Sequence, residues 1–282
     1  MRTNTRKLLA ALWVAITVFA SPWSGGQTLA QTTTLDEVKQ RSVLRAGVRQ
    51  DVPAFGSVDE KGQTVGFDVD VAAELAKRFG VKLEVVPVTA ATRIPLLQQG
   101  RIDLIAATLT HYRERDKVID FSIGYFWTGQ KLMVKKGSNI NSIADLAGKR
   151  AGTTVGALAI QNLTRAQPKA IGQTFEGYPE AFLAMQHGLV DAVVADVIIL
   201  AGLRARTAKP DDYVIIGESI GGGDYAIGVR ENDSKWRDAI NFALQDMWKD
   251  GTWDQLFDRW VGPPSALKLN KDEIGFKMEV WE

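Results

Sequence analysis

Polar side chains that could bind a small charged molecule follow several predicted strands of this chain. The set combines three arginines, two threonines and one aspartate: Arg49, Arg93, Thr108, Thr110, Arg115 and Asp196. Ligands of open α/β sheets bind beyond the carboxyl ends of the strands, where these residues stand. An arginine holds a carboxylate through two parallel charge-assisted hydrogen bonds, and an aspartate facing it would hold an ammonium group. The set therefore predicts a site for a small zwitterion that carries an additional negative charge.

Each of these residues also has an ordinary structural explanation. Surface arginines are usually solvated, and Asp196 stands directly before an apolar helical segment, where an aspartate commonly caps the helix. The binding hypothesis depends on the joint placement of the six residues at strand ends and not on any one of them.

The residue types and motifs that enzymes and metal sites need are missing or misplaced. The chain has no cysteine and only two histidines, which excludes thiol nucleophiles, iron–sulfur clusters and thiolate zinc sites. Residues 217–221 match G-x-S-x-G, but a strand instead of a helix follows Ser219, and both histidines precede it. Asp68 and Asp70 lack the ligand series of a calcium loop, so we interpret them as helix-starting residues that complement the helix dipole. We expect no cofactor, no metal and no enzymatic activity.

The composition is that of a globular protein with a nearly balanced charge. Apolar residues make up 45% and charged residues 24% of the 282 positions, and the formal net charge is +1. A nucleic-acid-binding protein would normally be clearly basic. We therefore expect a small molecule, and not nucleic acid, as the partner.

The first thirty residues have the three parts of a secretory signal peptide. Arg2, Arg6 and Lys7 precede an apolar run at 8–20, and Thr28-Leu29-Ala30 ends the segment with small side chains at its first and third positions. The run of about 13 residues is shorter than the ~20 needed to cross a bilayer, which disfavours a membrane anchor. We expect residues 1–30 to be cleaved and the mature protein, with a formal charge of −2, to be free in the periplasm.

Hydrophobic patterning alternates between short strands and helices in two successive series, which indicates parallel sheets covered by helices on both faces. The predicted strands are 43–48, 81–88, 102–107, 131–135, 150–154, 171–175, 192–195, 213–216 and 224–229. The predicted helices are 68 or 70–79, 94–99, 142–146, 158–165, 179–187, 197–206, 234–249 and 252–260. Apolar residues at helical spacing in 234–249 are predicted to pack in the core: Phe242, Leu244, Met247 and Trp248. Two such series predict two α/β lobes.

Several different short motifs lie at the starts of predicted strands and helices in the mature chain. They are Val65-Gly66-Phe67-Asp68-Val69-Asp70, Gln99-Gly100-Arg101-Ile102-Asp103, the run from Thr110 to Phe121-Ser122, Gly188-Leu189-Val190-Asp191-Ala192 with Asp196, and Asp250-Gly251-Thr252. Together they make the chain resemble the periplasmic polar-amino-acid-binding proteins of ABC importers, from Leu44 to about Pro264. Within that family, segments 93–98, 200–202 and 209–211 look most similar to the glutamate/aspartate-binding branch.

The resemblance implies a fold of the type II periplasmic binding proteins: two α/β lobes joined by two crossing strands, with the ligand cleft between them. Lobe 1 would comprise 31–129 and 225–282, and lobe 2 would comprise 130–224. The crossing strands would lie near 128–131 and 223–226. The implied function is to capture glutamate or aspartate by hinge closure and to deliver it to the membrane permease of an ABC importer. The protein would act as a monomer without a membrane anchor.

The resemblance also implies roles for individual residues. Arg115 would bind the α-carboxylate of the ligand, and Asp196 the α-ammonium group, helped by Thr108 and Thr110. Arg49 and Arg93 would face the side-chain carboxylate.

The chain departs from the family pattern in the second lobe. Ala157 and Leu158 stand where the family usually has a threonine pair, so backbone N–H groups at that helix start would have to hold the carboxylate. Tyr178 stands where the acidic branch often has histidine, and Ala90 where it has serine. These departures bear on the preference for an acidic ligand.

Two functions from other classes remain open. A periplasmic dehydratase acting on prephenate-type cyclic acids would resemble the same family and would need a general acid, for which His111 and Glu180 are the candidates. A ligand-sensing module is disfavoured because the sequence shows no transmembrane or signalling segment.

Overall fold

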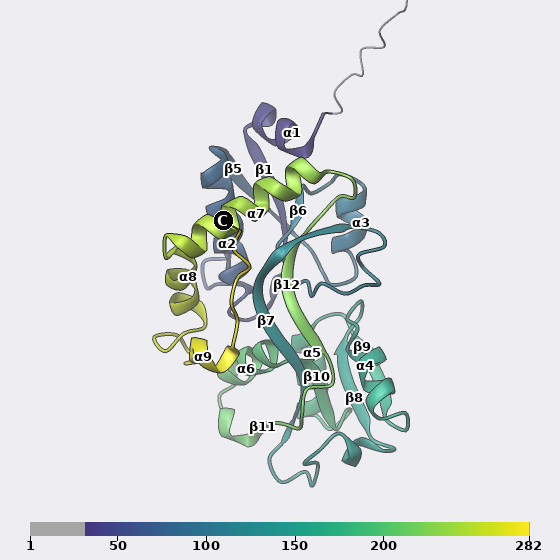
Figure 1. Ribbon diagram of the computed structural model, residues 1–282. Helices are drawn as coiled ribbons and strands as arrows, with labels where there is room; N and C mark the ends of the chain where they lie inside the picture. Colours follow the sequence, from purple (N-terminus) through teal and green to yellow (C-terminus); the bar gives the residue numbers. More distant parts are fainter. Residues whose placement is uncertain (1–31, 282) are drawn as a thin grey trace, which may run out of the picture. The chain divides into compact units, whose positions relative to one another are not determined.

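Two antiparallel strands, β7 (Asp120–Lys135) and β12 (Gly222–Val229), run side by side through the centre of the computed structural model (Figure 1). The structure describes residues 32–281, so the predicted signal peptide lies outside the described residues. The sheet follows the order β5-β1-β6-β12-β7-β10-β8-β9, and β11 also pairs with β7. The remaining strands of this sheet are β1 (Val43–Val48), β5 (Lys82–Pro87), β6 (Leu104–Ile105), β8 (Arg150–Thr154), β9 (Ile171–Phe175), β10 (Ala192–Asp196) and β11 (Tyr213–Ile216).

A short antiparallel sheet and the helices complete the described residues. The short sheet contains β2 (Asp51–Val52), β3 (Gly56–Val58) and β4 (Thr64–Val65). The α-helices are α1 (Thr34–Arg41), α2 (Phe67–Phe79), α3 (Arg93–Gln98), α4 (Ala159–Ala166), α5 (Tyr178–Gln186), α6 (Val197–Arg206), α7 (Ser234–Lys249), α8 (Thr252–Trp260) and α9 (Lys271–Ile274). Two 3₁₀ turns are η1 (Ala144–Leu146) and η2 (Pro210–Asp212).

The strands divide into two lobes that share β7. In the first lobe, β1 pairs in parallel with β5 and β6, and α2 packs on β1 and β5. In the second lobe, β8 pairs in parallel with β9 and β10, while β10 and β11 pair antiparallel with β7. The predicted α/β architecture with two lobes is confirmed. The residue numbers proposed for the lobe boundaries stay a prediction, because the described residues form one compact unit.

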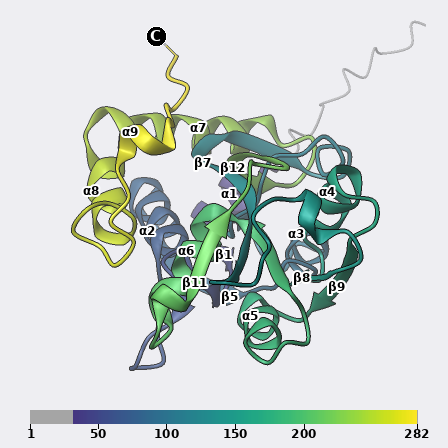
Figure 2. The same ribbon diagram turned by 90° about the horizontal axis from the view of Figure 1, so that it is seen from below.

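Strand β10 shows why the central strands are apolar on both faces. Val193 and Ala195 belong to the core cluster that includes residues of α5 and α6, whereas Ala192 and Val194 belong to the cluster that includes residues of α4. Figure 2 shows α4 and α5 on opposite sides of β8 and β9. Side chains alternate between the faces of a strand, so a sheet covered on both sides needs apolar residues at every position.

The central strand β7 is much longer than the predicted strand 131–135. Its 16 residues pair with β12 over the first part of the strand and with β10 and β11 over the last part. Glycines at 124 and 129 interrupt the apolar pattern, but they leave room for β12 and for the segment just before it. A Cβ atom at Gly129 would come within 2.4 Å of the Ser219 side chain, and one at Gly124 within 2.7 Å of the Asp224 side chain.

Buried aromatic rings pack where α2, β7, β12 and α8 meet. The ring centroids of Phe55 and Phe126 lie 5.0 Å apart in an edge-on contact, and those of Phe67 and Trp253 lie 6.0 Å apart. The cluster also contains Tyr125, Tyr225 and Phe257. Large rings bury much apolar area and lose few rotamers, so they hold neighbouring polar groups in fixed positions. The hydroxyls of Tyr125 and Tyr225 each donate to a buried carboxylate described below.

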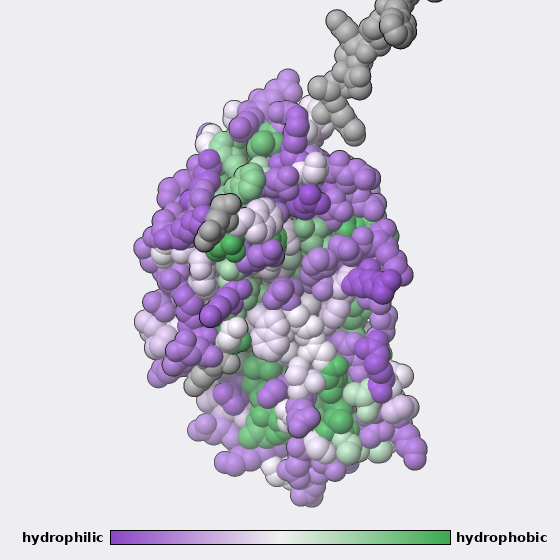
Figure 3. Space-filling model, in the orientation of Figure 1, coloured by the Kyte–Doolittle hydropathy of each residue, from purple (hydrophilic) through white to green (hydrophobic). Residues whose placement is uncertain are grey.

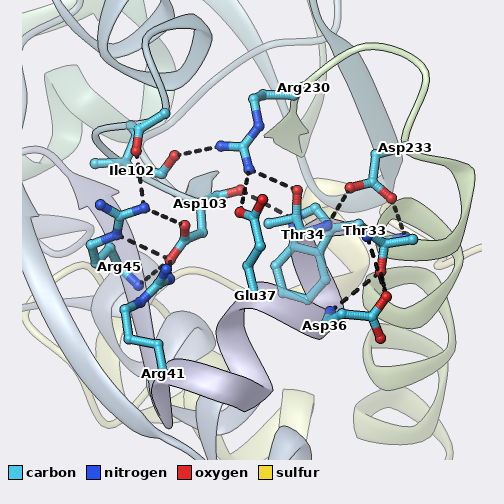
Figure 4. A network of polar contacts seen from close by, with 12 residues as sticks. Thr33, Thr34, Asp36, Glu37, Arg41, Arg45, Ile102, Asp103, Arg230 and Asp233 are labelled. Atoms are coloured by element: carbon cyan, nitrogen blue, oxygen red, sulfur yellow. Dashed lines mark hydrogen bonds and ion pairs between the residues drawn. The ribbon is translucent and has the colours of Figure 1, made fainter. Parts of the chain in front are cut away.

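A network of charged residues joins α1 to the first lobe (Figure 4). Asp103 has no exposed surface and accepts hydrogen bonds from the side chains of Arg41 and Arg45 and from the Arg45 backbone N–H. On the other side of α1, Asp233 accepts from the Thr34 backbone N–H at 2.7 Å. The network ties together segments that lie about 60 to 200 positions apart in the sequence. We call Asp103, Arg41 and Arg45 the Asp103 network.

The segment after α8 folds back over α7 and α8. Lys271 Nζ lies 4.4 Å from the ring centroid of Trp248, and Phe276 packs edge-on against the same ring at 5.8 Å. Apolar residues of β7, α6 and this segment line a hollow, and its wall includes Trp127, Ile198, Leu269 and Ile274. Figure 3 shows apolar surface, in green, on this part of the molecule. Between residues 32 and 281, none of the helices has both the length and the apolar character required to cross a membrane.

Candidate ligand-binding site

Polar residues from both lobes surround a small cavity. Its walls contain all nine residues that the sequence predicts as ligand-binding, together with Tyr112 and Gln130: Arg49, Arg93, Thr108, Thr110, Arg115, Ala157, Leu158, Tyr178 and Asp196. The space that remains open between these residues is only about 20 Å³. Pockets for small molecules usually measure about 300–1,000 Å³, so the two lobes enclose this site tightly in the structure.

Arg115 presents a buried positive charge to the cavity from the loop that follows β6. Its guanidinium donates to the Thr110 carbonyl at 2.9 Å and lies 5.5 Å from the ring centroid of Tyr112. Burial lowers the pKa of Arg115, while Tyr112 and Asp196 oppose that shift. One bond to a carbonyl and one aromatic contact leave most of its five N–H donors for a ligand.

Asp196 presents the opposite charge from the carboxyl end of β10. Its Oδ2 accepts a hydrogen bond from the Tyr225 hydroxyl at 2.6 Å, and its Oδ1 is buried without a hydrogen-bond partner among the described residues. Burial raises the pKa of Asp196, and the Tyr225 hydrogen bond and the Arg115 charge work against that rise. Asp196 occupies the N-cap position of α6, but its side chain makes no capping hydrogen bond. Its carboxylate is therefore directed to the cavity side and not to the helix.

Arg93 is buried, and its guanidinium bonds only to carbonyl groups among the described residues. It begins α3 and donates to the carbonyls of Ala107 at 2.5 Å and Thr108 at 3.3 Å, but its Nε has no partner among the described residues. Burial and repulsion from Arg115 and Arg49 place the pKa of Arg93 well below its ordinary value. A buried cation held only by carbonyls is unfavourable unless an anion approaches it.

Arg49 is in a different situation because it already has a carboxylate partner. Its Nε donates to Asp51 Oδ1 at 2.7 Å, and a second bond joins its Nη2 to Asp51 Oδ2. Although burial alone would lower the pKa of Arg49, the Asp51 carboxylate raises it above the ordinary value. The guanidinium also stacks over Tyr178, 4.8 Å from the ring centroid. Asp51 was not among the predicted site residues.

A strained turn places the two threonines beside the arginines. Thr108 has a φ of 46°, in the left-handed region, and its backbone N–H donates to Asp68 Oδ2 at 2.7 Å. Its hydroxyl is buried without a hydrogen-bond partner among the described residues. Thr110 forms an isolated antiparallel bridge with Tyr225. Strained residues with unpartnered polar atoms cluster at binding sites, where a ligand completes their hydrogen bonds.

Asp68 supports this turn in a way that the sequence did not indicate. It lies in the first turn of α2, as expected of a helix-starting residue, but it is fully buried and also accepts from the Tyr125 hydroxyl at 2.6 Å. Burial raises its pKa to about 7, against the hydrogen bonds from Tyr125 and Thr108 that favour the charged form. The predicted place at the start of a helix is therefore confirmed, while its burial and its bonds to Thr108 and Tyr125 were not predicted.

The second lobe contributes helix starts to the cavity wall. Ala157 and Leu158 precede α4, whose N-cap Leu158 offers no side-chain hydrogen bond. Tyr178 is the first residue of α5 and is buried. Gly156, just before this loop, packs so closely on the first lobe that a Cβ atom there would meet the Ala90 and Ala91 backbone at 2.7–2.8 Å. The lobes are thus in direct contact on this side of the cavity.

Two further wall residues, Tyr112 and Gln130, were missed. Gln130 lies on β7 and its Oε1 accepts from Asn162 Nδ2 at 2.7 Å. Both had a usable signal, since Tyr112 lies between Thr110 and Arg115 in sequence and Gln130 lies within the predicted crossing strand 128–131.

The two candidate general acids lie away from the cavity wall. His111 stacks on Phe121 at 4.2 Å between ring centroids and its Nε2 lies 2.9 Å from Asp116 Oδ1. Glu180 lines a separate cleft between the lobes, with Asp51, Glu176 and Gly177.

A two-lobed α/β fold with a charged cavity between the lobes is the arrangement of a solute-binding protein. Residues 44–263 match the family described as bacterial extracellular solute-binding proteins, family 3, and the chain belongs to that family. It is accordingly a solute-binding protein of the extracellular type.

Proteins named for different amino-acid ligands are similar to this chain. The chain is 36% identical to the ABC transporter glutamine-binding protein GlnH of Bacillus subtilis, over 81% of this chain and 84% of that protein. It is 30% identical to the L-glutamate/L-aspartate-binding protein of Pseudomonas aeruginosa, over 85% of this chain and 84% of that protein. A solved structure of an ancestral arginine-binding protein bound to arginine has a TM-score of 0.75 at 39% identity, covering 79% of this chain and 99% of that one.

Proposed function

We propose that this protein captures an acidic amino acid, glutamate or aspartate, and delivers it to the permease of an ABC importer. In this arrangement Arg115 binds the α-carboxylate, and Asp196 binds the α-ammonium group through its unpartnered Oδ1. The first turn of α4 adds backbone N–H groups on the carboxylate side. Thr108 supplies a further hydroxyl.

The single observation that carries the acidic preference is the uncompensated charge of Arg93. Arg49 is paired with Asp51, and Arg115 and Asp196 match the two charges common to every amino acid. Arg93 remains as a buried guanidinium that makes no hydrogen bond or ion pair with a carboxylate among residues 32–281, and its bonds go to two carbonyls. The side-chain carboxylate of glutamate or aspartate would neutralise the Arg93 guanidinium. The amide of glutamine would leave this charge unmatched, and the guanidinium of a bound arginine would be repelled by it.

Closure of the lobes would complete the site. The arginines and threonines come from the first lobe, and Asp196, Ala157, Leu158 and Tyr178 come from the second, so neither lobe alone encloses a ligand. A ligand that contacts both lobes stabilises the closed form by its differential affinity for it. The closed, liganded form would then be the one that the permease recognises.

The predicted location follows from the same function. A carrier that feeds an importer works outside the cytoplasmic membrane, and the predicted signal peptide would deliver it to the periplasm.

Calorimetry with glutamate, aspartate, glutamine, asparagine and arginine tests the ligand. We expect at least tenfold lower Kd values for the acids than for their amides. The variant Arg93→Gln should lose this preference, because it removes the charge that the acid neutralises. The control Arg101→Gln, at an exposed position, should keep it. Tighter binding of a neutral or basic amino acid to the wild type would contradict the proposal.

A further inference from the structure

Asp51 contacts both a cavity arginine and the opposite lobe. Its two oxygens form a pair of hydrogen bonds with Arg49, whose guanidinium is almost fully buried, while the Asp51 side chain is 25% exposed. A bidentate pair of this kind fixes the orientation of the guanidinium as well as its charge balance. The pair belongs to the first lobe, at the end of β1 and in β2.

The same carboxylate meets the start of α5 in the second lobe. Asp51 Oδ2 accepts from the Tyr178 backbone N–H at 3.3 Å, and the N-cap Gly177 provides no side-chain cap of its own. A Cβ atom at Gly177 would lie only 3.1 Å from Asp51 Oδ2, so the glycine leaves room for the carboxylate. The positive end of the helix dipole favours an anion at this position.

This contact makes the two arginines on the side-chain side of the cavity electrostatically unequal. Asp51 compensates Arg49 and raises its pKa, whereas Arg93 has no such partner among the described residues and has a strongly lowered pKa. With Asp51 charged, one of the two guanidinium groups has a hydrogen-bonded carboxylate and the other has none among the described residues. Without Asp51 neither would have one.

We propose that Asp51 is a specificity-determining residue, which neutralises Arg49 and so sets how strongly the site prefers an acidic over an amide side chain. The inference rests on the proposed function, because it assumes that Arg49 and Arg93 face the ligand side chain. Asp51 acts through Arg49 and the Tyr178 backbone, and it need not touch the ligand. The Arg49–Asp51 ion pair forms within the first lobe, and closure of the lobes places the start of α5 against it.

Isosteric acid and amide ligands separate this role from a purely structural one. A weakened lobe contact lowers the affinity for glutamate and glutamine by the same factor, whereas a changed charge balance alters their ratio. We therefore measure Kd for both ligands by calorimetry, and for aspartate and asparagine if that pair binds instead.

The variants form a charge cycle on one pair of residues. Asp51→Asn leaves Arg49 uncompensated and should raise the ratio of the glutamine Kd to the glutamate Kd about tenfold. Arg49→Gln leaves Asp51 uncompensated and should lower the ratio by a similar factor. The double variant should return within about threefold of the wild type. The control Glu180→Gln removes a carboxylate of the same outer cleft that is not bonded to Arg49, and should leave the ratio unchanged.

The outcomes distinguish the two proposals. If the wild type prefers the amide but Asp51→Asn still shifts the ratio toward the acid, the acidic specificity is wrong and the role of Asp51 stands. A ratio unchanged within twofold in Asp51→Asn, or shifted toward the amide, overturns the role of Asp51. If Asp51→Asn does not fold, the Arg49→Gln arm decides by the sign of its shift. Failure of the wild type to bind either acid–amide pair overturns both proposals.

Discussion

Two buried clusters of polar groups, the Asp103 network and the cavity between the lobes, differ in how many of their hydrogen bonds are made within the protein. In the Asp103 network, a fully buried carboxylate accepts from two arginine side chains and a backbone N–H. In the cavity, Arg93 Nε, Thr108 Oγ1 and Asp196 Oδ1 have no partner among the described residues. A completed network holds segments together, whereas unpaired buried groups cost stability and are kept where a ligand pairs with them. The difference separates the residues that hold the fold from those we assign to binding.

The largest expected effect is on binding, at the cavity cluster. Arg115→Ala should weaken amino-acid binding by about 4 kcal/mol, close to a thousandfold, because it leaves a ligand carboxylate buried and unpaired. Its midpoint of thermal unfolding should change little. Calorimetry and thermal melts measure the two quantities, with Arg101→Ala as the exposed control. Wild-type affinity in Arg115→Ala would remove Arg115 from the site.

The second effect is on stability, at the Asp103 network. Asp103→Ala should reduce the free energy of unfolding by about 3 kcal/mol, because it leaves Arg41, Arg45 and a backbone N–H without their acceptor. Urea denaturation measures this loss, and Asp246→Ala on the exposed side of α7 is the control. Ligand affinity should stay within twofold of the wild type. A large change in affinity with little loss of stability would show that the Asp103 network serves binding and not the fold.

The third effect concerns pH and the carboxylate of Asp68, which supports the cavity. Its pKa is raised to about 7 in the folded protein from an ordinary 3.8, so the folded state binds more protons than the unfolded state between these values. Its contribution to stability is therefore fully present below pH 3.8 and is lost as pH rises toward 7, with a slope of up to about 1.4 kcal/mol per pH unit.

Urea denaturation from pH 4 to pH 8 isolates this contribution by comparison with Asp68→Asn. The unfolding free energy of the wild type, relative to that of the variant, should fall with pH across this window. Asp70→Asn, in the same turn of α2, is the matched control. Parallel curves for wild type and Asp68→Asn would show that Asp68 titrates normally.

The smallest effect is expected at the hydroxyl that orients Asp196. Tyr225→Phe removes the 2.6 Å hydrogen bond to Oδ2 and should weaken ligand binding by about 1 kcal/mol, roughly fivefold. Tyr213→Phe removes a hydroxyl that accepts from Gln186 and should leave affinity unchanged. An equal effect of both substitutions in calorimetry would mean that the Tyr225 hydroxyl does not act on the site.

The hydrophobic pattern predicted the strands and helices best where the residues that pack in the core repeat at the spacing of a strand or a helix. The bounds of β1, β8, β9, β11, α6, α7 and α8 are those predicted. The short helices α1 and α9 were not predicted, because their few apolar positions give little periodicity. Phe242 was wrongly assigned to the core: it is 55% exposed and packs edge-on against Trp281. Helical spacing identifies a helix but does not say where its apolar stripe ends.

The residues that line the cavity could be predicted from the sequence because the ends of the strands could be predicted. The nine predicted residues all line it, since each follows a strand or begins a helix at the same edge of a sheet. Their pairing was not predictable. That Asp51 neutralises Arg49 while Arg93 stays unpaired depends on side-chain directions and on contact with α5, and neither has a signature in the local sequence.

The position of β12 between β6 and β7 has a consequence for the order in which the chain can fold. The last strand of the first-lobe sheet in sequence, at 222–229, fills an interior place in that sheet. Until the chain has been synthesised past residue 229, β6 and β7 lack their common neighbour and their backbone hydrogen-bonding groups stay unpaired on that side. The second lobe, continuous in sequence from β8 to β11, can form earlier. The first lobe begins the chain and is completed last, which favours slow acquisition of the native state.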